Sequence, residues 1–345
     1  MGGRFFLRRA GQAFLTILFV LVLNFILFHS LPGSPERILL RNPRISAAAL
    51  EAQRVRWGLD DPLLPISIKV DDKGIRLDDF PASLTDNQLF AYLSSTAQLD
   101  LGLSFQFRGR SVASVIGERF GPTLLLFGTG EVIAIAVGLW LGARAGWRRG
   151  TAVDYVGTGV SLVLYAMPYF WLGMILLIIF GAELRWFPTN GMVTPGREYA
   201  NVVDQVSDVL WHLTLPVATV ALGLIGQYSL MMRSSVTQVL SEDYVVTARA
   251  KGIRDGSVLR DHVLPNALLP AVTLIAINLG YIVAGAITVE QVFSWPGLGT
   301  LTVDALRTRD YPMMQGLFLV LSISVILANF VADMIYGLLD PRVRT

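Results

Sequence analysis

The side-chain chemistry of this 345-residue chain is sparse in the groups that most enzymes use. The sequence contains no cysteine, so disulfides, thiolate zinc sites and cysteine nucleophiles are excluded. Its three histidines, His29, His212 and His262, are scattered and lack the spacing of metal ligands. The sequence therefore predicts neither a metal site nor a catalytic site in this chain.

Two polar residues stand within long apolar stretches, where they are costly. Glu131 lies near the middle of one such stretch and Asn278 within another. A carboxyl group in that setting marks either a translocation pathway or a hydrogen bond between helices made by its neutral form. The residues leave both readings of Glu131 open, whereas an asparagine more often joins helices. We take the two together as the candidate translocation-pathway residues.

The loop between two later apolar stretches, from Ser241 to Ile253, predicts a short helix. Ser241 is a plausible N-cap, acidic residues follow it, basic residues come at the end, and Gly252 stands where a helix C-cap belongs. Ala248 and Gly252 are four residues apart, so we expect them to share a side on which another surface can approach closely. The alternative is an ordinary surface helix whose glycine only caps it.

The elements that carry these residues are membrane-spanning helices. Hydrophobic residues make up 53% of the chain and charged residues 16%, whereas a soluble domain carries about 25% charge. About 20 apolar residues cross a bilayer, and six stretches qualify: Ala10–Leu31, Pro122–Ala143, Val156–Phe180, Trp211–Met231, Leu268–Val289 and Gln315–Leu339. The first is read as a retained anchor, because no small-residue cleavage site follows it. We expect kinks at Met167-Pro168 and at Pro216.

The distribution of positive charge predicts that both termini are cytoplasmic. With the N-terminus inside, thirteen arginines and lysines fall on the cytoplasmic side: 4, 8, 9, 144, 148, 149, 233, 249, 251, 254, 260, 342 and 344. Only four fall in the two short outer loops: 185, 197, 307 and 309. The net charge of +2 is too small to indicate a nucleic-acid surface.

This topology divides the chain into three parts. Residues 1–31 form the N-terminal tail and first span, 32–121 an outer segment, and 122–345 a core of five spans with a cytoplasmic loop at about 232–266. In the outer segment we expect a helix within Ser46–Trp57, a turn at Asp71–Gly74 and a short helix within Asp78–Leu99. Trp186, Trp211 and Trp295 are expected at the outer membrane interface.

Several sequence motifs resemble those of one family of transport proteins. The run from Glu242 to Gly252, followed by Asn266–Pro270, resembles the EAA loop of ABC importer permeases, and more narrowly of their peptide/nickel branch. The segments Gly58–Leu63, Asp100–Ser104, Glu290–Gly299, Arg309–Pro312 and Leu339–Arg342 are similar to stretches of that branch. The long outer segment resembles the B-type member of a B/C permease pair. Two departures are extra outer residues near 66–90 and Pro265 in place of a polar residue.

The resemblance implies the type I importer fold, with six transmembrane helices and half of a translocation pathway for peptides. It implies as partners a C-type permease, a substrate-binding protein, and two ATPase subunits or a fused pair that use ATP and Mg. It also implies which residues couple to the ATPase: Glu242, Asp243, Tyr244, Ala248, Ala250 and Gly252. The sequence has no G-x-x-x-x-G-K-[ST] phosphate loop, so this chain is not expected to be the motor.

Other functions remain alternatives at this point. Relatives in the family also carry nickel, glutathione or oligosaccharides. An ion-coupled secondary transporter would use Glu131 as a proton site, but it would not need a docking loop. An intramembrane enzyme lacks nucleophile–base pairs and metal ligands in this sequence.

Overall fold

The computed structural model describes residues 3–29, 67–71, 74–78, 87–107, 109–281 and 287–339. The chain forms two compact units. The first contains residues 1–10, 120–300 and 324–345, and the second contains residues 11–119 and 301–323.

Four helices are each long and apolar enough to cross a membrane: α1 (Gly3–His29), α5 (Val112–Trp147), α8 (Val202–Val239) and α15 (Tyr311–Leu339). Two further spans are bent pairs. In one, α6 (Ala152–Ala166) precedes α7 (Tyr169–Leu176) and the π-helix η1 (Leu177–Glu183). In the other, Asp255–Ala267 precedes α12 (Leu269–Tyr281). If each pair is one span, the described residues contain six spans, which confirms the predicted membrane fold.

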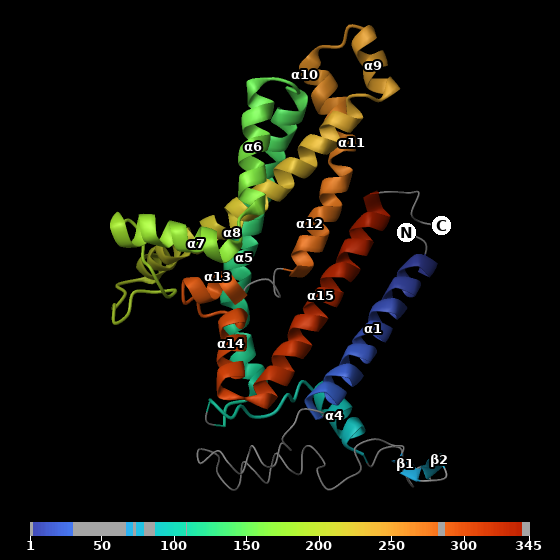
Figure 1. Cartoon of the computed structure of the whole chain (residues 1–345), viewed down its shortest axis with the longest axis vertical. Helices are drawn as coiled ribbons and strands as arrows, with labels where there is room; N and C mark the ends of the chain where they lie inside the picture. The colour runs from blue at the N-terminus through green and yellow to red at the C-terminus, as the bar shows by residue number, and fades with distance from the viewer. Residues whose placement is uncertain are drawn as a thin grey trace. The chain divides into compact units, whose positions relative to one another are not determined.

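The third predicted span, 156–180, contains a sharp bend at the predicted kink. The two halves of the pair meet at an angle of 103°, and Figure 1 shows α7 turning away from the axis of α6. Pro168 disfavours helical geometry in the residue before it, and Met167 is extended with ψ 128°. The predicted break at Met167-Pro168 is therefore confirmed. Pro216, by contrast, lies inside α8 without ending that helix.

The fourth span is longer than its apolar core suggested. α8 has 38 residues, which at about 1.5 Å per residue gives roughly 57 Å, against a hydrocarbon thickness of about 30 Å. One end or both ends of α8 must therefore extend past the hydrocarbon core.

A row of glycines on α5 allows close packing against α8. A Cβ atom added at Gly138 would lie 2.6 Å from Tyr228 Cβ, and one at Gly146 would lie 2.9 Å from the Arg233 carbonyl oxygen. Gly142, between them, would bring a Cβ even closer to the Ser229 carbonyl. Small residues four apart are a common means of close helix contact in membranes.

Polar contacts also join α6 to α8. Ser161 donates a hydrogen bond to Ser229 over 2.8 Å. Nearer the other end of α6, Arg233 forms a two-pronged ion pair with Asp154, with distances of 2.5 and 3.0 Å. These contacts connect three neighbouring helices of the first unit into one bundle.

A buried carboxylate holds the loop between α13 (Ile287–Val292) and α14 (Leu298–Thr308). Glu290 accepts hydrogen bonds from the Thr123 hydroxyl on α5 (2.7 Å) and from the Thr300 backbone N–H (2.9 Å). Trp295 is fully buried and donates its indole N–H to the Pro122 carbonyl over 2.9 Å. The expectation that Trp295 is an interfacial anchor is therefore wrong, because its ring packs inside the protein.

The second unit contains the described part of the outer segment. Strands β1 (Ser67–Asp71) and β2 (Gly74–Asp78) pair antiparallel around the predicted turn, with Asp71 opposite Gly74. The helix predicted within 78–99 is α4 (Gln88–Ala97), capped by the side chain of Asn87. The helix predicted within Ser46–Trp57 lies outside the described residues.

The boundary predicted after residue 121 falls inside a helix, because α5 begins at Val112. Two of the motifs noted above meet in this unit. The Ser104 hydroxyl donates to Asp310 over 2.5 Å, and Asp310 in turn caps α15 by accepting from the Met313 N–H. Segments about 200 residues apart in sequence are thus joined by one carboxylate.

Candidate functional site

The helix predicted in the loop after α8 is present as α9, Asp243–Ala250. Its N-cap position is Glu242 and not Ser241, whose hydroxyl instead bonds to the Gln238 carbonyl. Asp243 in the first turn and Arg249 in the last turn complement the helix dipole. Figure 1 shows α9 beside α10 (Asp255–Ser257), at the same end of the first unit.

Gly252 ends this helix through its backbone conformation. Its φ angle is +76°, in the left-handed region that glycine adopts without strain. The Gly252 N–H donates to the Arg249 carbonyl, and the Ile253 N–H donates to the Ala248 carbonyl. This pair of hydrogen bonds is a Schellman motif, so the predicted C-cap is confirmed.

One side of α9 is buried within this chain. Val245 (0% exposed) and Ala248 (5% exposed) are three residues apart and pack into an apolar cluster whose other members are Met232, Val236, Val258, Val263 and Ala267. The expectation that Ala248 presents a small surface to another protein is therefore wrong. Ala248 instead lets α9 sit tightly on its own membrane helices. Gly252 does not share that side, because it lies past the helix end with open space around it.

The free side of α9 lies opposite Val245 and Ala248. At 100° per residue it is formed by Asp243, Val246, Thr247 and Ala250, all exposed. Asp243 and Ala250 lie at the centre of this face, and Val246, which is 57% exposed, lies at one edge of it. Tyr244 is also exposed, and desolvation together with the negative charge of Glu242 raises the pKa of its hydroxyl. That hydroxyl is thus neutral at physiological pH and able to donate a hydrogen bond.

A further contact fixes α9 to the end of α5. Arg249 lies over the Trp147 ring at the end of α5, with its guanidinium carbon 5.2 Å from the ring centroid. After Gly252 the chain continues through α10, the π-helix η2 (Val258–Val263) and α11 (Leu264–Ala267) into α12. Pro265 occupies the first turn of α11, where its missing N–H costs little.

The pair of polar residues predicted within the spans is brought together by a third residue. The Tyr228 hydroxyl on α8 donates a hydrogen bond to Glu131 on α5. The Asn278 amide on α12 donates to the same hydroxyl over 3.0 Å and to the Gln227 side chain over 3.3 Å. Glu131 is 2% exposed and Tyr228 is fully buried. This geometry favours a polar joint between three helices over a carboxyl group lining an open path.

Sequence reasoning missed two features of these sites. Tyr228 was not singled out, although a tyrosine within an apolar span requires a hydrogen-bond partner. Val246 was also missed. The spacing of Val245 and Ala248 was a usable signal, since two apolar residues three apart define the inner face and therefore the outer one.

Comparison with known proteins identifies the family to which this chain belongs. A family model described as the binding-protein-dependent transport system inner membrane component matches residues 134–345. The chain belongs to this family. It is a multi-pass membrane permease component, and its matched region contains α8, α9 and α12.

Two relatives are similar in sequence to the permease along almost its full length. It is 32% identical over 340 residues to the oligopeptide transport system permease protein AppB of Bacillus subtilis strain 168, covering 99% of each chain. It is 36% identical over 329 residues to the glutathione transport system permease protein GsiC of Escherichia coli strain K12, covering 95% of each chain.

A solved structure shows the same fold at low sequence identity. The permease resembles a chain of the MetNI methionine ABC transporter in an inward-facing conformation, with a TM-score of 0.51 and 15% identity. The match covers 66% of this chain and 96% of the other. The type I importer fold predicted from the sequence is therefore confirmed.

Proposed function

We propose that this permease forms half of a peptide translocation pathway and that α9 is the element through which partner ATPases drive it. The proposal rests on the arrangement of α9. A glycine cap ends the helix, its inner face is buried against other helices of the chain, and its outer face is exposed. A rigid helix attached to two spans can transmit a push from outside the membrane to both of them.

The mechanical connection runs through the buried cluster. Met232 and Val236 belong to α8, whereas Val263 and Ala267 belong to the segment leading into α12, and Val245 and Ala248 pack between them. Because cores are close-packed and nearly incompressible, a displacement of α9 must move both helices. We propose that Glu242, Asp243, Tyr244 and Ala250 contact the ATPase directly, and that Ala248 and Gly252 hold the helix in place for that contact.

We propose that other chains supply the energy for transport. The sequence has no phosphate-binding loop, and so we propose that two ATPase subunits, or a fused pair, bind ATP and Mg on the cytoplasmic side. A C-type permease completes the pathway, and a substrate-binding protein delivers the cargo from outside. The excess of positive charge in the predicted inner loops supports cytoplasmic placement of both termini.

Peptides are the proposed cargo because the named relatives share that chemistry. AppB is an oligopeptide permease and GsiC is a glutathione permease, and glutathione is itself a short peptide. Nickel complexes and oligosaccharides are the alternative cargoes, and competition assays on uptake of a labelled peptide distinguish them.

The test of α9 uses two variants of the same residue type. Val246→Glu places a charge on the exposed outer face of α9, and Val203→Glu places one on an exposed valine (77% exposed) near the other end of α8. We expect Val246→Glu to reduce co-purification of the ATPases and ATP-dependent uptake in proteoliposomes at least tenfold, and Val203→Glu to leave ATPase association unchanged. Normal association and uptake in Val246→Glu would overturn the assignment of α9.

A further inference from the structure

The second unit contains a polar joint between three helices that the transport proposal does not use. Asn24 on α1 is fully buried. Its side-chain amide donates to the Tyr92 hydroxyl on α4 over 2.9 Å and to the Gln315 backbone carbonyl on α15 over 3.2 Å. One asparagine thus connects a helix of the outer segment to two helices of the membrane part.

Two buried atoms of this joint have no hydrogen-bond partner among the described residues: Asn24 Oδ1 and Gln315 Nε2. Turning the Asn24 amide over would not solve the problem, because its oxygen would then face the Gln315 carbonyl oxygen, and two acceptors cannot bond. A buried donor or acceptor without a partner is costly and uncommon in folded proteins. Gln315 Nε2 therefore needs an acceptor, and Asn24 Oδ1 needs a donor.

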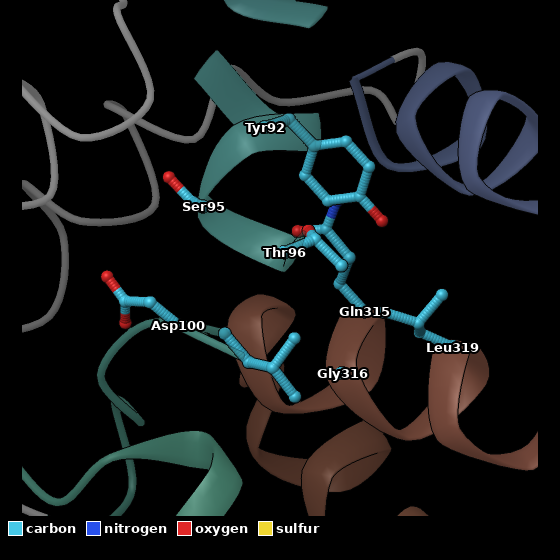
Figure 2. A pocket seen from close by; sticks show the side chains of 8 residues that line it. Tyr92, Ser95, Thr96, Asp100, Gln315, Gly316 and Leu319 are labelled. Atoms are coloured by element: carbon cyan, nitrogen blue, oxygen red, sulfur yellow. The ribbon is translucent and has the colours of Figure 1, made fainter. Parts of the chain in front are cut away.

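A small pocket lies beside the Gln315 side chain. It is formed by residues of α4, the turn after it and α15: Tyr92, Ser95, Thr96, Asp100, Leu101, Gln315, Gly316 and Leu319. Figure 2 shows the Gln315 side chain reaching from α15 toward Tyr92 and Thr96 of α4. The cavity volume is about 20 Å³, and a cavity of at least roughly 10–15 Å³ on this measure holds one water molecule.

We propose that this pocket is a binding site for one ordered water molecule, which accepts a hydrogen bond from Gln315 Nε2. The volume admits nothing much larger than water, and the lining residues nearest to the Gln315 side chain in Figure 2, Tyr92 and Thr96, carry hydroxyl groups. Burial raises the pKa of the Tyr92 hydroxyl, which therefore stays neutral and able both to donate and to accept. The water gives Gln315 Nε2 its partner in the pocket between α4 and α15.

The inference is tested on the full chain in its assembled transporter, by two measurements. The first is a density map at a resolution that shows ordered waters elsewhere on α4 and α15. A peak within hydrogen-bond distance of Gln315 Nε2 is expected. No peak at that position, with other waters visible, overturns the proposal.

The second measurement uses the sign of a stability change. Gln315→Met removes the Nε2 donor and keeps the side-chain length, whereas Leu319→Met introduces the same residue at a buried position of the same pocket (3% exposed) without removing a polar atom. If water is bound, Gln315→Met takes away one of its partners and lowers the thermal midpoint by about 2–4 °C relative to Leu319→Met. An unchanged or higher midpoint, or an equal fall in both variants, overturns the proposal.

Discussion

The Tyr228 hydroxyl on α8 donates a hydrogen bond to the Glu131 carboxylate on α5, and both side chains are buried. The Asn278 amide on α12 reaches the same hydroxyl. The carboxyl group of the second span is thus part of a junction between three helices. This arrangement weakens the interpretation of Glu131 as the proton site of an ion-coupled carrier.

A double-mutant cycle of Glu131→Leu and Tyr228→Phe should show that these two residues stabilise the same junction. Side-chain hydrogen bonds between membrane helices are worth about 0.6 kcal/mol on average and up to about 1.7 kcal/mol, and we expect a coupling free energy in that range. The measurement is reversible unfolding in mixed micelles. Strictly additive effects would contradict the junction. Loss of uptake in a stable Glu131→Gln variant would instead support a pathway or proton role.

Packing between α5 and α8 should be sensitive to volume at Gly142 and insensitive at Gly128. A Cβ at Gly142 would collide with the Ser229 carbonyl, whereas one at Gly128 on the same helix meets nothing within 4 Å. Gly142→Val should cost about 1–3 kcal/mol by overpacking, and Gly128→Val should cost much less. Thermal unfolding of the purified permease measures the difference, and equal midpoints would refute the close contact.

The end of α9 should depend on the backbone of Gly252 and not on space around it. A Cβ at Gly252 meets nothing within 4 Å, but its φ of +76° is unfavourable for a β-branched residue. Gly252→Val should cost about 1–2 kcal/mol, whereas Gly252→Asn should cost less, because asparagine tolerates this region.

The readout for Gly252 is ATP-dependent uptake together with ATPase association. Gly256→Val is the matched control, because Gly256 also has open space around it but no positive φ. If Gly252→Val and Gly256→Val behave alike, the cap does not position α9, and its role in the coupling proposal is withdrawn.

Topology is checked by fused reporters. With both termini inside, a reporter after Asp78 in β2 should be active only outside the cytoplasm, and one after Thr345 only inside. Both results follow from the excess of arginine and lysine in the predicted cytoplasmic loops. The reverse pattern at either site would require the orientation of the spans to be redrawn.

The sequence by itself determined the features that depend on local composition. Apolar runs of about 20 residues located the six spans because a bilayer demands that length whatever the helices contact. Met167-Pro168 located the sharp bend because the restriction before proline is local. Gly252 marked the end of α9 because a left-handed cap depends on the backbone conformation of a single residue.

Only the tertiary structure decided which faces meet. Ala248 reads as a small, available surface in the sequence, yet it is buried because α8 and the segment entering α12 converge behind α9. Trp295 reads as an interfacial anchor, yet its ring is fully buried and its indole donates to the Pro122 carbonyl on α5. Glu131 and Tyr228 are 97 residues apart, and no local pattern pairs them. Whether a side chain is buried, and which group it bonds to, depends on how helices far apart in the sequence pack together. No single segment of the sequence contains that information.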